Sequence, residues 1–319
     1  MVQTLYYLLK TARPRQWIKN LAVYAALVFS GLFFFDFPNY LLQVTTTFFL
    51  FCILSSSLYI LNDIVDRKSD KQHPFKKKRP LASGDLSVRT ALLAASSGII
   101  LSLIISLSLS PFLFLITGSY LLLQLAYNMV LKSIPILDVL AIAAGFMLRV
   151  YAGAITVNLH MNVWFLLTVI SASLFIAVSK RQSERTLLTG MENRVGFATR
   201  KTLEKYSQRL LDIYTGMFAN ATWLTYALFA FQLDSSVTAG NIPTLLAYVP
   251  RAFVAQKWLM LTVPLVIYIV MRYLQLVYEN NQGESPERVL LQDKPLLAAA
   301  IVWGTMVMTI LYFLEMIAV

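Results

Sequence analysis

Long apolar segments recur along the whole chain, and only short polar segments separate them. A helix needs about 20 apolar residues to cross the roughly 30 Å hydrocarbon core of a bilayer. Nine segments of the sequence approach that length. Of the 319 residues, 58% are hydrophobic and only 13% are charged, a composition outside the range of ordinary soluble domains. The chain is therefore predicted to be an integral, multi-pass membrane protein.

The predicted fold is all-α, a polytopic bundle of transmembrane helices that forms one domain over residues 1–319. The expected spans are Leu21–Phe35, Tyr40–Leu61, Val88–Leu109, Pro111–Leu131, Val139–Thr156, Val163–Ser179, Leu211–Leu233, Trp258–Tyr278 and Pro295–Met316. The one cysteine, Cys52, lies in an apolar segment and is predicted to be a small buried side chain. No cleavable signal peptide is evident, so the first span is expected to direct insertion.

The basic residues predict the orientation of the chain. They gather before the first span and in the loops after the second, sixth and eighth spans, whereas the opposite loops hold almost none. Because basic residues stay on the cytoplasmic side, the N-terminus and the large loops 62–87 and 180–209 are predicted to be cytoplasmic, in the plasma (inner) membrane. This orientation and anionic headgroups explain the net charge of +11, and no nucleic acid partner is expected.

The first large loop begins with a row of carboxylates. Asp63, Asp66 and Asp70 are separated by helical spacings of three and four residues, which place them on one helical face. Such a row repels itself unless cations neutralise it. Magnesium prefers oxygen ligands and commonly joins one or two carboxylates to substrate phosphates. The three aspartates, with Asn62 beside them, are therefore candidate magnesium ligands.

A basic cluster follows at residues 76–79, where three lysines and Arg79 stand in a row between Pro74 and Pro80. Cations of this density suit phosphate oxygens, and a metal ion with basic side chains stabilises a departing diphosphate. A solvated cytoplasmic loop would explain the lysines alone. It would not explain the aspartates, so a metal–diphosphate site is the favoured interpretation.

The segment 62–70, followed by Arg-Pro-Leu-Ala-Ser-Gly at 79–84, resembles the signature of the UbiA superfamily of intramembrane prenyltransferases. This resemblance implies nine helices around a central cavity that cytoplasmic loops cap. Aromatic prenyltransferases of the superfamily carry a second aspartate-rich motif after span six. Here residues 179–185 hold one acid and three bases instead, which resembles the phosphoribosyltransferase branch. Segments 13–20, 131–139, 145–149 and 283–287, with Asp293, agree with that branch.

The resemblance implies a Mg²⁺-dependent transferase of cell wall biosynthesis that moves 5-phosphoribosyl from phosphoribosyl diphosphate to a polyprenyl (decaprenyl-like) phosphate and releases diphosphate. A phosphate nucleophile is already ionised at neutral pH, so no general base is needed. His73 and His160 are accordingly weak catalytic candidates. The alternatives are an aromatic polyprenyltransferase that uses a polyprenyl diphosphate donor and, as a non-enzyme, a membrane transporter. The oligomeric state stays open, with a homo-oligomer among the alternatives.

The implied roles fall into two groups. Asp63, Asp66 and Asp70 form the catalytic, metal-binding group together with Asn62. The candidate substrate-binding residues are Lys76 and Arg79 for the donor phosphates, Lys180, Arg181 and Glu184 for the sugar phosphate or ribose hydroxyls, Lys19 and Arg149, and, more weakly, Tyr127 and Lys132. Arg149 lies inside a span, where an unpaired charge is costly, and is expected to face the site. Asp138 is either a helix N-cap or a functional residue.

Overall fold

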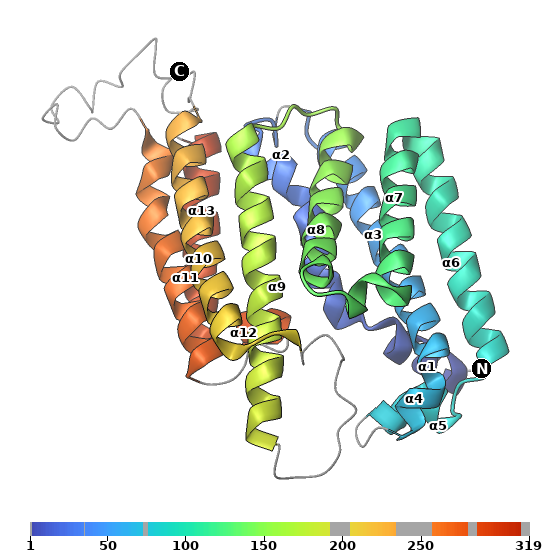
Figure 1. The fold of residues 1–319 in the computed structure, drawn as a ribbon. Coiled ribbons are helices and arrows are strands. Elements are labelled where there is room, and N and C mark those ends of the chain that lie inside the picture. Colours follow the sequence, from blue (N-terminus) through green and yellow to red (C-terminus); the bar gives the residue numbers. More distant parts are fainter. Residues whose placement is uncertain are drawn as a thin grey trace, which may run out of the picture. The chain divides into compact units, whose positions relative to one another are not determined.

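The computed structural model describes residues 2–34, 36–72, 76–191, 205–233, 257–279 and 286–313. Every regular element in these residues is a helix, which confirms the all-α prediction (Figure 1). The chain divides into two compact units, and each is described by itself.

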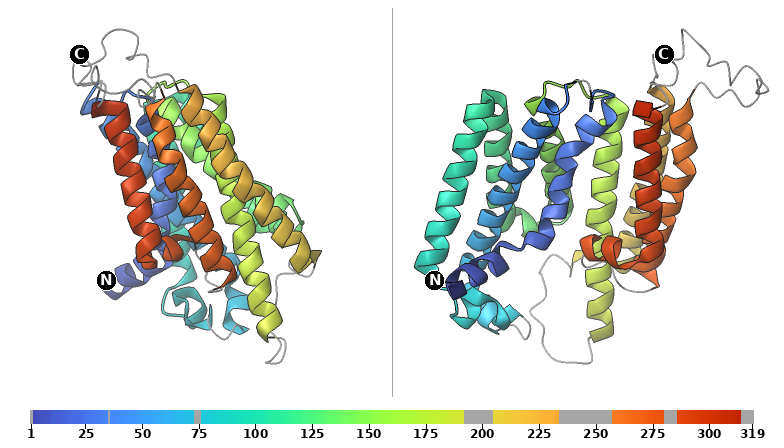
Figure 2. Two further views of the ribbon diagram at one scale, coloured as in Figure 1. Left: turned by 90° about the vertical axis from the view of Figure 1, so that its left-hand side faces the viewer. Right: turned by 180° about the vertical axis from the view of Figure 1, so that it is seen from behind.

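The first unit takes in residues 2–27, 37–160 and 205–206 of the described chain. Its helices are α1 (Val2–Ala12), the 3-10 helix η1 (Pro14–Tyr24), α3 (Asn39–Val65), α4 (Arg67–Gln72), η2 (Lys76–Lys78), α5 (Pro80–Ser83), α6 (Val88–Leu109), α7 (Pro111–Met129), η3 (Leu131–Ser133) and α8 (Leu137–Thr156). The four long helices α3, α6, α7 and α8 pack side by side (Figures 1 and 2).

The second unit takes in residues 28–36, 161–190 and the described residues from 207 onward. Its helices are α9 (Val163–Met191), α10 (Gln208–Gln232), η8 (Trp258–Thr262), α11 (Val263–Tyr278), α12 (Pro286–Gln292), α13 (Lys294–Met308) and the π-helical turn η9 (Thr309–Phe313). The short helix α2 (Ala25–Phe29) passes from the first unit into the second.

Seven helical segments in the described residues are long and apolar enough to cross a membrane, and all seven coincide with expected spans. Helix α6 has the predicted bounds, Val88–Leu109. The expected span 211–233 is also helical, as α10, but it is not among the seven. The expected first span, 21–35, is not one continuous helix, because it consists of the end of η1, the five-residue α2 and a turn. The count of nine spans stays a prediction.

Although it is not a long α-helix, η1 runs antiparallel to α3. Trp17 Nε1 donates to Ser56 Oγ at 3.0 Å, Asn20 Nδ2 donates to Ser55 Oγ at 3.2 Å, and Tyr24 contacts Thr45 at 2.9 Å. Later residues of η1 thus meet earlier residues of α3. A 3-10 helix rises about 2 Å per residue, so a short segment covers a long distance.

Side-chain caps fix where several helices begin. Ser87, Ser110 and Ser207 accept hydrogen bonds from backbone N–H groups at the starts of α6, α7 and α10, and Asp293 does the same for α13. Such caps satisfy donors that the first helical turn leaves unpaired. They are sequence-local features, which is why the starts of these helices lie close to the predicted positions.

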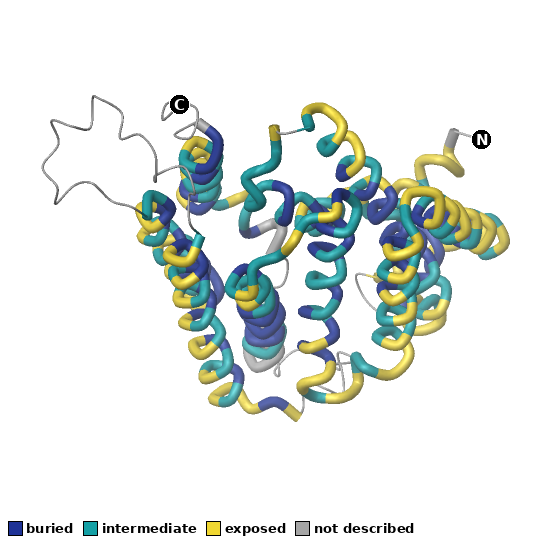
Figure 3. The backbone as a smooth tube through the Cα atoms, turned by 90° about the horizontal axis from the view of Figure 1, so that it is seen from above, coloured by how far each residue is buried: buried dark blue, intermediate teal, exposed yellow. Residues whose placement is uncertain are grey.

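Large apolar side chains remain exposed along the long helices. Leu93 and Ile104 of α6 and Leu115 and Leu122 of α7 are among them, and Figure 3 shows exposed positions recurring along the helices. Exposed apolar surface of this extent marks contact with an apolar surrounding. This burial pattern agrees with helices that face lipid.

Candidate functional site

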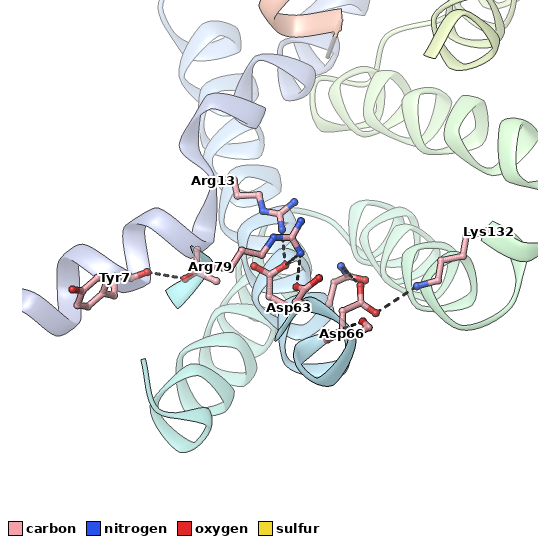
Figure 4. Close-up of polar contacts among 10 residues, drawn as sticks. Tyr7, Arg13, Asp63, Asp66, Arg79 and Lys132 are labelled. Atoms are coloured by element: carbon pink, nitrogen blue, oxygen red, sulfur yellow. Dashed lines mark hydrogen bonds and ion pairs between the residues drawn. The ribbon is translucent and has the colours of Figure 1, made fainter. Parts of the chain in front are cut away.

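The end of α3 carries the centre of the candidate site. Asp63 is buried, and its Oδ1 accepts from Arg13 Nη2 at 2.5 Å and from Arg79 Nη1 at 3.2 Å. Arg79 Nη1 also donates to Oδ2 of buried Asp70 at 2.7 Å. Figure 4 shows the two guanidinium groups converging on Asp63. Two aspartates and two arginines therefore form one ion-paired group at the end of α3 that is predicted to lie on the cytoplasmic side.

Local packing positions Arg79 against these carboxylates. Leu81 and Leu86, which follow it in the sequence, are buried in an apolar cluster with residues of α1, α3 and α6. Gly84 has φ +96°, a left-handed conformation that ends α5 at little steric cost. Arg67 Nε donates to the carbonyl oxygen of Leu81 at 3.0 Å. The motif at 79–84 thus anchors a turn whose first residue faces the aspartates.

Asp66 has a different environment from Asp63 and Asp70. Its carboxylate accepts from Asn62 Nδ2 at 3.1 Å and lies 3.8 Å from Lys132 Nζ, which comes from η3 (Figure 4). The α-helix α3 ends at Val65, and α4 begins at Arg67. The structure therefore brings together the predicted residues Asn62, Asp63, Asp66, Asp70, Arg79 and Lys132. Within this set, Asp63 and Asp70 share one arginine, and Asp66 faces a lysine.

Arg13 contacts the site, although it was not among the residues predicted to bind the metal or the donor. Its guanidinium lies 5.2 Å from the centre of the Tyr59 ring, and its backbone adopts φ 53° and ψ 61°. A non-glycine residue with positive φ is uncommon and costs conformational energy. The available signal was the Arg-Pro-Arg sequence at 13–15, which marks a turn rich in cations but does not name the partner of Arg13.

The donor atoms suit a divalent cation together with phosphate. No group of three or more acidic, histidine or cysteine side chains converges as a metal site in the part of the chain that the structure describes. However, Asp63 Oδ1 and Asp70 Oδ2 both contact the single atom Arg79 Nη1, so two carboxylates already surround one cationic position. Magnesium typically takes one or two carboxylates and completes its shell with phosphate oxygens and water. The residues present fit that arrangement.

Arg149 of α8 lies in a separate buried polar cluster. Its Nε donates to Asn20 Oδ1 at 2.8 Å, its Nη1 to the Gly145 carbonyl oxygen at 2.9 Å, and its Nη2 to Tyr120 Oη at 2.6 Å. The guanidinium also stacks 4.7 Å from the Tyr120 ring centre. The sequence predicted that this charge faces the site, and that stays a prediction. It did not predict Asn20 or Tyr120 as partners, because they come from segments distant in the sequence.

The remaining candidates occupy mixed positions. Lys19 donates to Gln16 in the same helix at 2.5 Å. Lys76 is exposed in η2, and Tyr127 is half-buried near the end of α7. His160 is exposed. His73 and residues 283–285 lie outside the described residues.

Asp138 is not the N-cap of α8, which corrects one of the two interpretations of this residue. The capping position is Ile136, with no side-chain cap. Asp138 lies in the first helical turn, is buried, and accepts from Tyr206 Oη at 2.9 Å. The sequence missed Tyr206 because 68 residues separate the two partners.

The second predicted group belongs to α9, in the other unit. Arg181 Nη1 donates to Glu184 Oε2 at 2.6 Å, one turn along the helix, and Lys180 is half-buried beside them. Gln182 Nε2 donates to Asp212 of α10 at 2.5 Å, a contact that the sequence did not predict. Residues 180–191 therefore continue α9, which corrects the predicted loop that was expected to begin at residue 180. The functions of Lys180, Arg181 and Glu184 stay predictions.

The comparisons agree with the resemblance drawn from the motifs. Residues 20–292 match the UbiA prenyltransferase family. The chain is 33% identical to decaprenyl-phosphate phosphoribosyltransferase of Mycolicibacterium smegmatis over 96% of this chain and 92% of that one. It is 32% identical to the enzyme of the same name from Corynebacterium glutamicum over 97% of this chain and 88% of the relative.

The solved structures support the fold. A UbiA homolog from Archaeoglobus fulgidus bound to GPP and Mg²⁺ aligns with a TM-score of 0.64 at 18% sequence identity. The alignment covers 95% of this chain and 99% of that one. At this identity the likeness concerns the arrangement of helices alone.

Proposed function

Because the chain belongs to the UbiA prenyltransferase family, we propose that it transfers a 5-phosphoribosyl group from phosphoribosyl diphosphate to a polyprenyl phosphate and releases diphosphate. The relatives that carry the name decaprenyl-phosphate phosphoribosyltransferase match it along nearly its whole length. The observation that carries the proposal is the ion-paired group of Asp63, Asp70, Arg13 and Arg79, which offers both carboxylate and guanidinium groups to a magnesium diphosphate.

A bound magnesium diphosphate can replace the ion pairs within this group, because its phosphate oxygens can bind the arginines and its magnesium ion can bind the aspartates. Arginine forms strong, geometrically defined hydrogen bonds with phosphate oxygens. When Arg79 turns toward a phosphate, Asp63 and Asp70 lose a cationic partner and become available to magnesium. Asp66, with Asn62 and Lys132 beside it, would complete the site. The magnesium ion, when bound, would neutralise charge on the diphosphate leaving group.

The transfer itself exchanges one bond to the anomeric carbon of the ribose for another. An oxygen of the lipid phosphate forms a bond to that carbon, while the bond from the carbon to the diphosphate oxygen breaks and the electron pair leaves with diphosphate. No proton has to move, since the attacking phosphate is already ionised. The chain therefore contributes orientation and charge stabilisation, which are the two contributions that its site residues can make.

The basic group on α9 is proposed to bind the sugar phosphate and ribose hydroxyls. Lys180 and Arg181 would neutralise the 5-phosphate, and Glu184 would accept from ribose hydroxyls. The sequence segment 179–185 holds a single acid, which supports the proposal because the second aspartate-rich motif of the aromatic prenyltransferases has more carboxylates. The aromatic polyprenyltransferase remains the alternative function, and the assay below separates the two.

We also propose that the protein lies in the plasma membrane and that its site faces the cytoplasm. The basic residues near the ends of the helices support this orientation. Phosphoribosyl diphosphate is a soluble anion, whereas the acceptor is a lipid, so a site at the membrane surface can receive both.

The direct test uses purified protein, Mg²⁺, labelled phosphoribosyl diphosphate and a polyprenyl phosphate. A parallel mixture contains polyprenyl diphosphate and 4-hydroxybenzoate. Label is expected to enter the lipid, and the transfer is expected to disappear with a chelator or in Asp66→Asn. Prenylated hydroxybenzoate without labelled lipid would overturn the proposal in favour of the aromatic prenyltransferase.

A further inference from the structure

The connection between α7 and α8 carries Lys132 and contains a residue in an unusual conformation. Ile136 has φ 70° and ψ −49°. L-residues rarely adopt positive φ, and for a β-branched residue this is a clear outlier, since its Cβ crowds the backbone. Such a conformation persists only where neighbouring contacts hold it in place.

The hydroxyl of Tyr206 supplies such a contact. Ile136 N donates to Tyr206 Oη at 2.5 Å, and the same hydroxyl donates to Asp138 Oδ1 at 2.9 Å. Tyr206 is 2% exposed and Asp138 is 1% exposed. A buried hydroxyl that both donates and accepts a hydrogen bond fixes its partners strongly, because any other arrangement leaves a buried polar group unsatisfied.

Backbone hydrogen bonds connect this point to Lys132. Ile134 N donates to the Leu131 carbonyl oxygen at 3.1 Å, and Asp138 N donates to the Ile134 carbonyl oxygen at 3.1 Å. Lys132 lies within the first of these turns, where its Nζ is 3.8 Å from Asp66 Oδ1. A shift of the Ile136 backbone would therefore move the segment that presents Lys132.

From this geometry we infer that Tyr206 is a positioning residue, which holds the α7–α8 connection so that Lys132 stands at Asp66. The inference rests on the proposed function, because it assigns the Asp66 region to the magnesium diphosphate of the donor.

The first test is Tyr206→Phe, which removes the hydroxyl and keeps the ring. Binding of inorganic diphosphate in the presence of Mg²⁺ is measured by calorimetry on the full chain in detergent. We expect about tenfold weaker binding, the effect of losing one contact to a charged group. In the assay, KM for phosphoribosyl diphosphate should rise, while KM for the lipid phosphate should stay unchanged.

A double-mutant cycle with Lys132→Met separates positioning from general stability. If Tyr206 acts through Lys132, the double variant should bind diphosphate no more than about twofold more weakly than Lys132→Met alone. Asp138→Asn retains an oxygen that can accept from the tyrosine, so it should bind nearly as well as the wild type. Tyr6→Phe is the matched control, because Tyr6 is an exposed tyrosine on α1.

The outcomes distinguish this inference from the proposed function. Full additivity of the two losses, or wild-type diphosphate binding by Tyr206→Phe, would overturn the positioning role alone. If the wild-type protein binds diphosphate but transfers no phosphoribosyl group, the proposed function is wrong. The double-mutant cycle on diphosphate binding still tests the positioning role. If Tyr206→Phe unfolds at a much lower temperature than the wild type, Asp138→Asn and the double-mutant cycle, both measured at a lower temperature, still show whether Tyr206 acts through Lys132.

Discussion

Asp63 and Asp66 lie three residues apart, yet their surroundings predict different consequences of the same substitution. Asp63 is buried between two arginines, whereas the Asp66 side chain is 31% exposed and meets Lys132 at 3.8 Å. Asp63→Asn leaves two guanidinium groups with a weaker partner, which should cost about 1–3 kcal/mol of stability. Asp66→Asn removes one loose surface pair and should change stability by less than about 0.5 kcal/mol.

Both substitutions should lower the rate of phosphoribosyl transfer on the order of a hundredfold, since each removes a charge from the proposed donor site. Thermal unfolding in detergent, measured beside the assay, separates the two effects. Equal unfolding temperatures for the two variants would show that the arginine pairs around Asp63 contribute little to stability.

The sequence predicted the carboxylates of this site but not all of their partners. Helical spacing places aspartates without any knowledge of the rest of the fold, because it depends only on local geometry. Arg13 lies 50 residues from Asp63, and Lys132 lies further along the chain than either, so these contacts depend on how distant segments pack. The spacing could therefore predict a cation site, but it could not predict that arginines meet two of the three acids.

At the scale of elements, one glycine determines how closely η1 approaches α8. A Cβ atom added to Gly153 would lie 1.8 Å from the carbonyl oxygen of Val23, which is backbone and cannot rotate away. Gly153→Ala should therefore separate the two helices and cost about 1–3 kcal/mol, as overpacking does elsewhere. Gly118→Ala in α7 is the matched control, because nothing lies within 4 Å of its added Cβ.

Alanine also has the higher helix propensity, so the control variant should unfold at or slightly above the wild-type temperature. Thermal unfolding of both variants in one detergent makes the comparison. A Gly153→Ala protein as stable as Gly118→Ala would mean that η1 and α8 are not in the close contact described here.

A pair between α11 and α13 gives a prediction about acid stability. Arg272 donates to both carboxylate oxygens of Asp293, at 3.2 and 2.8 Å, and Asp293 also caps α13 by accepting from Leu296 N. The hydrogen bonds from Arg272 lower the pKa of Asp293 below its usual value of 3.8. A depressed carboxyl pKa stabilises the fold above the unfolded-state value, and this contribution is lost as the pH falls through the folded-state value.

Stability should therefore decline as the pH falls below about 4. In Asp293→Asn the part of this decline that comes from Asp293 should be absent, and the variant should already be less stable at neutral pH. Arg272→Gln should weaken the same pH dependence, because it removes the cause of the pKa shift. Unfolding temperatures between pH 3 and pH 7 provide the measurement. If the unfolding temperature of both variants fell between pH 7 and pH 3 as much as that of the wild type, the role of the pair would be contradicted.

The helices were predictable where apolar runs and local caps coincide, as in α6, whose bounds match the expected span. The first span was predicted less well. The helix η1 begins seven residues before the expected span and includes polar residues such as Lys19 and Asn20. Hydrogen bonds from Asn20 to α3 hold this segment in place. Hydropathy measures only an average along the chain, so it cannot show that a 3-10 helix runs alongside a neighbouring helix and packs against it.

At the scale of the whole molecule, the path of η1 bears on how many times the chain crosses the bilayer. Helix α1 packs against α3 and α5, so the start of the chain lies at the same end of the first unit as the aspartates. From there η1 runs antiparallel to α3 as far as Thr45. The distance from Asp63 to Thr45 along α3 is roughly 27 Å, close to the thickness of the hydrocarbon core. Residues 14–29 should therefore cross the membrane even though they form no long α-helix.

Labelling of single cysteines with a membrane-impermeant maleimide tests this path and the orientation together. The native Cys52 is 1% exposed, so it should contribute little background. Gln3→Cys and Lys77→Cys should stay unlabelled in intact cells and react after permeabilisation. His160→Cys should react in intact cells, because the three helices α6, α7 and α8 separate it from residue 77.

The pattern distinguishes the possible errors. Labelling of Gln3→Cys, but not of Lys77→Cys, in intact cells would show that residues 14–29 do not cross the bilayer and would remove one of the nine predicted spans. Labelling of both, with His160→Cys protected, would reverse the orientation and place the aspartates outside the cell. Phosphoribosyl diphosphate would then have no access to them from the cytoplasm, so the labelling result also bears on the donor that the site can use.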